Sequence, residues 1–175
     1  MIKKFIDDRG DFVIYDAHAC DQVNVVTNTY PYTFRGLHYQ TDPAQAKTVK
    51  VIQGKVLDFL YNLDTKEVQI YLLDKQSDPL YVGENFAHGY LTLEPHTIFT
   101  YAVEGEYDPN SEHSIVWKDV DLIYNVVMSH LPSGNALLIS EKDTKGKTNL
   151  SEEERKNFDN YTLDVVTYVN IDEKE

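Results

Sequence analysis

The sequence predicts an all-β protein, built as an antiparallel sandwich or barrel in a single domain. Its 175 residues suit one domain, because domains commonly run about 100–200 residues. Short apolar runs separated by turn residues dominate from about position 10 to about position 125. Strands that follow one another so closely form antiparallel sheets, whereas parallel strands need long crossover connections.

Six strands are predicted in this region because its apolar runs are rich in β-branched and aromatic residues. In chain order they cover residues 33–40, 47–53, 55–64, 67–74, 88–94 and 96–107. Gly54 marks a tight turn between the second and the third strand. Other turn residues lie at 64–66, 78–79, 94–95 and 108–110.

The end of the chain is predicted to form an extension, about residues 146–175, of the single domain 1–175. Ser151 followed three residues later by Glu154 forms a capping box, which predicts a short helix over residues 151–161. Residues 161–175 alternate well enough for one last strand before an acidic end.

Charge and cysteine content exclude several kinds of partner and cofactor. The formal net charge of −13 argues against nucleic acid, which needs a basic surface. Cys20 is the only cysteine, so neither an intrachain disulfide nor a cysteine-based metal cluster is expected. Lys3 and Lys4 are not followed by a long apolar run, which predicts neither a signal peptide nor a membrane span. We therefore expect a cytoplasmic protein with no membrane partner.

Four stretches concentrate residues that could carry chemistry. They are residues 8–10, residues 35–40 followed by 44–47, residues 85–90 and residues 140–143. His38 lies in a predicted strand and can face the interior of a barrel, in which case Gly36 and Gln40 face it as well. The 13 tyrosines favour strands and sugar-facing pockets.

In their order and spacing these motifs resemble the dTDP-4-dehydrorhamnose 3,5-epimerase family. The motifs are RGLHYQ at 35–40, AQAK at 44–47, GKVLD at 54–58, FAHGY at 86–90 and SEKD at 140–143. The resemblance runs from about residue 6 to about residue 145. It implies a cupin-type jelly-roll β-barrel, a homodimer and an isomerase that acts on a nucleoside-diphosphate 4-keto-6-deoxy sugar.

The resemblance also implies an active site for proton transfer next to a ketone. The ketone at C4 of such a sugar acidifies the protons at C3 and C5, so a base can remove one and leave an enolate. Inversion then needs an acid on the opposite face and positive charge near the enolate oxygen. His38 matches the base, Asp143 the carboxylate that orients it, Tyr101 the proton donor and Lys47 the charge at the enolate.

Binding roles follow from the same resemblance. Arg9 and Arg35 match residues that hold the diphosphate, which suits the forked donors of arginine. Phe12 fits an aromatic position beside the nucleotide, although a core position explains it nearly as well. Gln45 and Asn85 could contact sugar hydroxyls, or could only serve in caps and turns.

His88 is expected near the sugar, with metal ligation as the alternative. Metal sites in barrels of this type use two histidines one residue apart, together with a glutamate and a distant histidine. The positions at that spacing from His38 are Gly36 and Gln40, so the paired ligands are missing. We therefore expect neither a catalytic metal nor another cofactor.

Three departures from the family pattern surround the nucleotide and the diphosphate. Ile14 replaces an acidic residue, Val26 replaces a glutamine two residues before Asn28, and residues 122–126 replace a Gly-Ile-x-Trp-Pro segment. The simplest interpretation is preserved chemistry on a substrate that is held differently. Two alternatives remain, a nucleotide-sugar ketoisomerase and a non-catalytic sugar-binding module. The nucleotide, the sugar and the choice between C3, C5 or both stay open.

Overall fold

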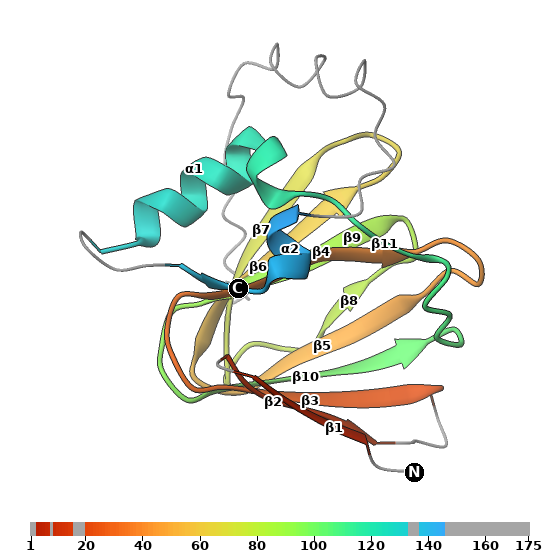
Figure 1. Ribbon diagram of the computed structural model, residues 1–175, viewed down its shortest axis with the longest axis horizontal. Helices are drawn as coiled ribbons and strands as arrows, with labels where there is room; N and C mark the ends of the chain where they lie inside the picture. The colour runs from red at the N-terminus through yellow and green to blue at the C-terminus, as the bar shows by residue number, and fades with distance from the viewer. Residues whose placement is uncertain (1–2, 8, 16–19, 133–136, 146–175) are drawn as a thin grey trace, which may run out of the picture.

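The computed structural model describes residues 3–7, 9–15, 20–132 and 137–145, without the side chains of 3–6 and 10–15. Two antiparallel sheets face each other (Figure 1). The first sheet has the order β1 (Lys3–Asp7), β2 (Gly10–Tyr15), β3 (Gln22–Asn28), β10 (Thr97–Glu104), β5 (Ala46–Gln53) and β8 (Leu80–Val82). The second has the order β11 (Glu112–Ser114), β4 (Thr33–Gln40), β9 (Phe86–Thr92), β6 (Lys55–Asn62) and β7 (Val68–Asp74). A short strand, β12 (Leu138–Ile139), runs parallel to β4.

All six strands predicted from the sequence are present, with ends that differ by a few residues. Gly54 does make a turn, at a φ of 82°, but this turn is a corner and not a hairpin, because β5 and β6 lie in different sheets. A Cβ atom at Gly54 would lie 2.3 Å from Oγ1 of Thr97, so the corner also needs the small residue. The helix and strand predicted for 151–161 and 161–175 lie outside the described residues.

Helix α1 (Asp121–His130) was not predicted, and it covers the outer face of the second sheet (Figure 1). Its N-cap residue, Val120, makes no side-chain capping bond, so the usual signal for a helix start is missing. Ile123, Val126 and Val127 are buried on one face at a spacing of three and four residues. The departure at residues 122–126 is therefore a packing element.

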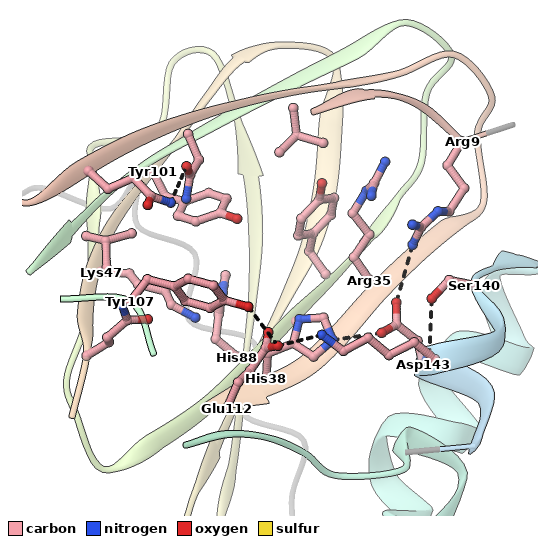
Figure 2. Close-up of a pocket in the computed structure, with 18 residues that line it drawn as sticks. Arg9, Arg35, His38, Lys47, His88, Tyr101, Tyr107, Glu112, Ser140 and Asp143 are labelled. Atoms are coloured by element: carbon pink, nitrogen blue, oxygen red, sulfur yellow. Dashed lines mark hydrogen bonds and ion pairs between the residues drawn. The ribbon is translucent and has the colours of Figure 1, made fainter. Parts of the chain in front are cut away.

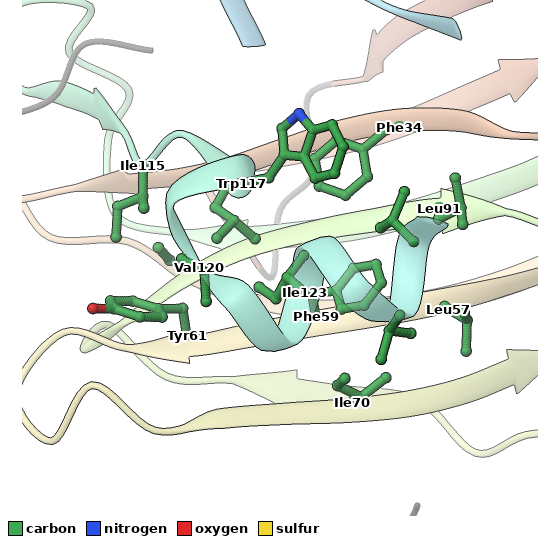
Figure 3. Packing of buried hydrophobic residues seen from close by; sticks show 14 residues of the cluster. Phe34, Leu57, Phe59, Tyr61, Ile70, Leu91, Ile115, Trp117, Val120 and Ile123 are labelled. Atoms are coloured by element: carbon green, nitrogen blue, oxygen red, sulfur yellow. The ribbon is translucent and has the colours of Figure 1, made fainter. Parts of the chain in front are cut away.

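The central strands of the second sheet are buried on both faces. From Val56 to Tyr61 every residue of β6 is buried, because one face meets the first sheet and the other meets α1. The outer cluster packs Phe34 and Phe59 against Trp117 and Ile123 (Figure 3). Each fully buried large apolar side chain contributes about 1.5–3 kcal/mol, so this cluster fixes the strands that carry the site.

No helix in the described part of the chain is long and apolar enough to cross a membrane.

Candidate active site

A cavity of about 380 Å³ lies between the two sheets, and side chains of both sheets line it (Figure 2). Eight of the residues predicted for the site lie on its wall: Arg9, Arg35, His38, Gln45, Lys47, His88, Tyr101 and Asp143. All four predicted catalytic residues are therefore brought together. They come from β4, β5, β10 and the short helix α2 (Glu141–Lys145).

His38 forms a hydrogen-bonded pair with Asp143. Nε2 of His38 lies 2.7 Å from Oδ1 of Asp143, whose side chain is only 2% exposed. The backbone N–H of Asp143 donates to Oγ of Ser140, and Nη1 of Arg9 lies 3.4 Å from Oδ2 of Asp143. Burial alone would raise the pKa of Asp143, but these contacts hold it below its ordinary value. With Nε2 engaged, Nδ1 is the ring nitrogen of His38 that can accept a proton.

The local backbone of β4 brings this histidine to the cavity. Gly36 has a φ of 116°, and a Cβ atom there would lie 2.5 Å from Cα of Gly89 on the neighbouring strand. No other residue fits so close to β9. The register between β4 and β9 shifts between Arg35 and His38, so the simple alternation used for Gly36 and Gln40 does not hold across this segment. Gln40 donates to the carbonyls of Pro43 and Glu106 and is not among the cavity residues.

Lys47 and Tyr101 lie on the first sheet, and burial shifts the pKa of each side chain in the direction that favours its neutral form. Burial lowers the pKa of Lys47 to about 8, although Glu112 and Asp58 oppose the shift. Burial likewise raises the pKa of Tyr101, and the neighbouring Tyr90 adds to the rise. Tyr101 thus holds its proton at neutral pH, as a proton donor must.

Arg35 and Arg9 present cationic nitrogens at one side of the cavity. Nε of Arg35 donates to Oδ1 of Asn28 at 3.0 Å. Its Nη2 is buried and has no hydrogen-bond partner among the described residues. Arg9 pairs with Asp7 at 2.6 Å and with Asp143. A buried, unpaired guanidinium nitrogen is a favourable place for an anionic ligand.

His88 forms a second histidine–carboxylate pair on the neighbouring strands. Its Nε2 lies 3.0 and 2.9 Å from the two oxygens of Asp58, which is fully buried. Gln45 lines the cavity while it donates to the carbonyl of Gly105 at 3.0 Å. In the described part of the chain no cluster of three or more histidine, cysteine, aspartate or glutamate side chains could hold a metal ion.

Two predicted binding residues are not brought to the cavity by any described side chain. Asn85 is exposed just before β9 and is not among the lining residues. Phe12 lies on β2 opposite Val26, but its side chain falls outside the described part of the structure. The roles of both residues remain predictions.

Sequence reasoning missed several polar residues that line the cavity. Gln22 and Asn24 come from β3, which was not predicted as a strand; its alternation with Val26 was the available signal. Tyr107 donates to Oε2 of Glu112 at 3.2 Å, and the same oxygen accepts from Nζ of Lys142 at 2.7 Å. Burial alone would raise the pKa of Glu112, but Lys142 and His38 hold it below its ordinary value.

A family model described as dTDP-4-dehydrorhamnose 3,5-epimerase matches residues 2–151. The chain belongs to this epimerase family. A dTDP-4-dehydrorhamnose 3,5-epimerase of Pseudomonas aeruginosa is 31% identical over 159 residues, covering 82% of this chain and 85% of the relative. One from Methanothermobacter thermautotrophicus is 33% identical, and there the match spans 65% of this chain and 63% of the relative.

Solved epimerase structures agree with this family and with the fold. The enzyme of Bacillus anthracis, with TDP and PPi bound, has a TM-score of 0.61 and 30% identity over 82% of this chain and 88% of that one. The enzyme of Legionella pneumophila, in complex with dTDP-4-keto-L-rhamnose, has a TM-score of 0.64 and 26% identity over 88% of each chain. The expected family, the cupin-like β fold and an isomerase of the epimerase type are thereby confirmed.

Proposed function

We propose that this epimerase removes a proton next to the ketone of a nucleoside-diphosphate 4-keto-6-deoxy sugar and returns a proton to the opposite face. The product is inverted at C3, at C5 or at both carbons. The observation that carries the proposal is the placement of His38 and Tyr101, which come from different sheets and line one cavity (Figure 2). Inversion needs a base and an acid on opposite sides of one carbon.

Each step follows from the contacts of these residues. Nδ1 of His38 takes the proton, the C–H electron pair moves into the enolate, and Asp143 stabilises the resulting imidazolium at 2.7 Å. The ammonium of Lys47 stabilises the negative oxygen at C4. Tyr101 then gives its proton to the opposite face of the carbon, and solvent restores both protonation states. The reaction is redox-neutral and needs no co-reactant.

The diphosphate of the substrate is assigned to the arginine side of the cavity. The support is the buried Nη2 of Arg35, which has no partner within the described residues, together with the nearby charge of Arg9. Val26 lies on the cavity wall and offers no side-chain hydrogen bond. We therefore expect the base of the nucleotide to be selected only weakly, with thymidine less than about a hundredfold preferred, since each lost hydrogen bond weakens recognition by about 0.5–1.5 kcal/mol.

The experiment is to incubate the protein in deuterated water with 4-keto-6-deoxy sugars linked to thymidine, uridine, guanosine and cytidine diphosphate. Proton NMR then reports deuterium at C3 and C5, and the coupling constants report inversion. We expect deuterium at an inverted carbon of at least one substrate. A non-catalytic sugar-binding module would bind without labelling any carbon, and that result would reject the proposal.

We also propose a homodimer in the cytoplasm. On the outer face of the first sheet, Val23 and Val25 lie opposite Ala102 and Thr100, and the same sheet exposes Ile52 and Tyr81 by 52% and 58%. A largely apolar sheet face of this kind suits self-association. A stable monomer in sedimentation at micromolar concentration would contradict the dimer. A single cysteine, Cys20, is compatible with a reducing compartment.

A further inference from the structure

The cavity wall beside Tyr101 carries a pair of amide side chains that the chemistry described above does not use. Gln22 and Asn24 are two residues apart on β3, so they share one face of the strand, and both line the cavity. Nε2 of Gln22 donates to Oδ1 of Asn24 at 2.6 Å, and Asn24 is only 2% exposed. A buried amide is costly unless its hydrogen bonds are made, so the remaining group of Asn24 needs a partner.

That partner lies on the neighbouring strand. In the register of β3 and β10, Asn24 is directly opposite Tyr101, and such cross-strand pairs hold their Cβ atoms about 4.5–5.5 Å apart on the same face. Both side chains line the cavity from this face, and the Asn24 amide opposes the rise in the pKa of the Tyr101 hydroxyl. Because Oδ1 of Asn24 already accepts from Gln22, Nδ2 is the group of Asn24 that is left to donate to the phenolic oxygen.

We infer that Asn24 and Gln22 are positioning residues for the proton donor. Asn24 donates its amide hydrogen to the oxygen of Tyr101, and Gln22 fixes the orientation of the Asn24 amide. This inference rests on the proposed function, in which Tyr101 delivers the proton to the inverted carbon.

Proton donation is the step in which the pair acts. When Tyr101 protonates the carbon, its O–H bond breaks, the new C–H bond forms and the negative charge passes from the enolate to the phenolic oxygen. Burial makes this phenolate unfavourable, which is why the pKa of Tyr101 is raised, and a hydrogen bond from Asn24 and the charge of Arg35 oppose the rise. The amide therefore directs the O–H group and stabilises the charge that the step leaves behind.

The test separates proton removal from proton delivery in deuterated water. In the Asn24→Leu variant, His38 can still remove the proton and return a deuteron to the same face, so exchange continues while inversion fails. We expect inversion to fall by about 10- to 100-fold, the range for one hydrogen bond to a charged oxygen, with exchange changed less than about threefold. Tyr101→Phe should separate the two rates in the same direction and by more.

Two further variants test the roles within the pair. Gln22→Met keeps the length of the side chain and should lower inversion less than Asn24→Leu does. The double variant should be no worse than Asn24→Leu alone, because Gln22 acts only through Asn24. Thr27→Ser is the matched control, since Thr27 lies on the same strand, is not among the cavity residues and pairs with Ile98; it should keep both rates.

Two kinetic results would overturn the inference. Exchange and inversion that fall in parallel in Asn24→Leu would assign the residue to general structure. A higher KM with an unchanged ratio of the two rates would make Asn24 a direct contact of the sugar.

A measurement without substrate tests the contact itself. In protein labelled with carbon-13 at Cζ of tyrosine, the resonance that disappears in Tyr101→Phe belongs to Tyr101. It should move in Asn24→Leu and stay in place in Thr27→Ser, and a resonance that does not move in Asn24→Leu would reject the hydrogen bond. Wild-type protein that neither exchanges nor inverts any of the sugars would instead reject the proposed function, so the two failures are distinguishable.

Discussion

The two walls of the cavity are built in different ways. On the second sheet, His38 depends on Asp143, which lies 105 residues away in the chain and belongs to a helix outside the sheet. On the first sheet, Tyr101 is held by its sheet neighbours, with Asn24 and Val49 opposite it on the two adjoining strands. The geometry of the base therefore depends on the docking of a short helix, and the geometry of the acid depends on sheet register.

The largest effect is expected from removal of the base. His38→Ala should lower both exchange and inversion by at least about 100-fold, the usual scale for a general base, whereas the Tyr101 and Asn24 variants of the other wall should spare exchange. His96→Asn is the control, because His96 is exposed, lies outside the cavity and has a positive φ that asparagine tolerates. Unchanged turnover in His38→Ala would show that the two walls do not divide the chemistry as proposed.

A pH profile tests the first sheet at Lys47, whose pKa is about 8. The ammonium form exists below that pKa, so kcat/KM should fall as the pH rises through 8, by about tenfold for each further unit. In Lys47→Arg the positive charge persists above pH 8, so the kcat/KM that remains should no longer fall as the pH rises. Lys50→Arg, on the same strand but outside the cavity, should keep the wild-type profile. A fall that persists in Lys47→Arg would assign the titration to another group.

A smaller effect should come from the contact that ties the helix to the second sheet. Lys142 on α2 pairs with Glu112 on β11 at 2.7 Å, and its side chain is 48% exposed. An exposed pair contributes only about 0.2–1 kcal/mol, so Lys142→Met should lower exchange and inversion together by a few-fold. Lys145 pairs with Glu141 on the same helix. Lys145→Met therefore removes a lysine without breaking a contact between the helix and the sheet, and it should change neither rate. A loss confined to inversion would place Lys142 with the acid.

Chelation should have the smallest effect of all. The proposed chemistry uses only side chains of the protein, and the two histidines of the cavity, His38 and His88, each pair with a carboxylate. Activity should survive exhaustive treatment with EDTA, and elemental analysis should find no stoichiometric transition metal. Activity that is lost to the chelator and restored by one particular metal would overturn this prediction.

The sequence predicted the second sheet better than the first. The apolar run of β6 is interrupted only by Asp58, and β4 carries Phe34, Leu37 and Tyr39, so both strands are recognisable locally. β3 was missed although buried and partly exposed residues alternate along it. Three of its inward residues are polar: Gln22 and Asn24 line the cavity, and Asn28 accepts a hydrogen bond from Arg35. A polar interior removes the hydrophobic signal on which strand prediction depends, so β3 was missed, whereas β4, β5 and β10, which carry His38, Lys47 and Tyr101, were predicted.

By itself the sequence determined the strand-rich fold, the order of the motifs and the kinds of side chain available for proton transfer. These are local properties, set by side-chain periodicity and by turn residues. Tertiary structure decided which of these side chains meet: Asp143 reaches His38 through the docking of α2, and Asn24 faces Tyr101 through the register of two strands far apart in the chain. Such pairings are set by packing between distant segments, so the first was expected only from the family resemblance, and no local pattern predicted the second.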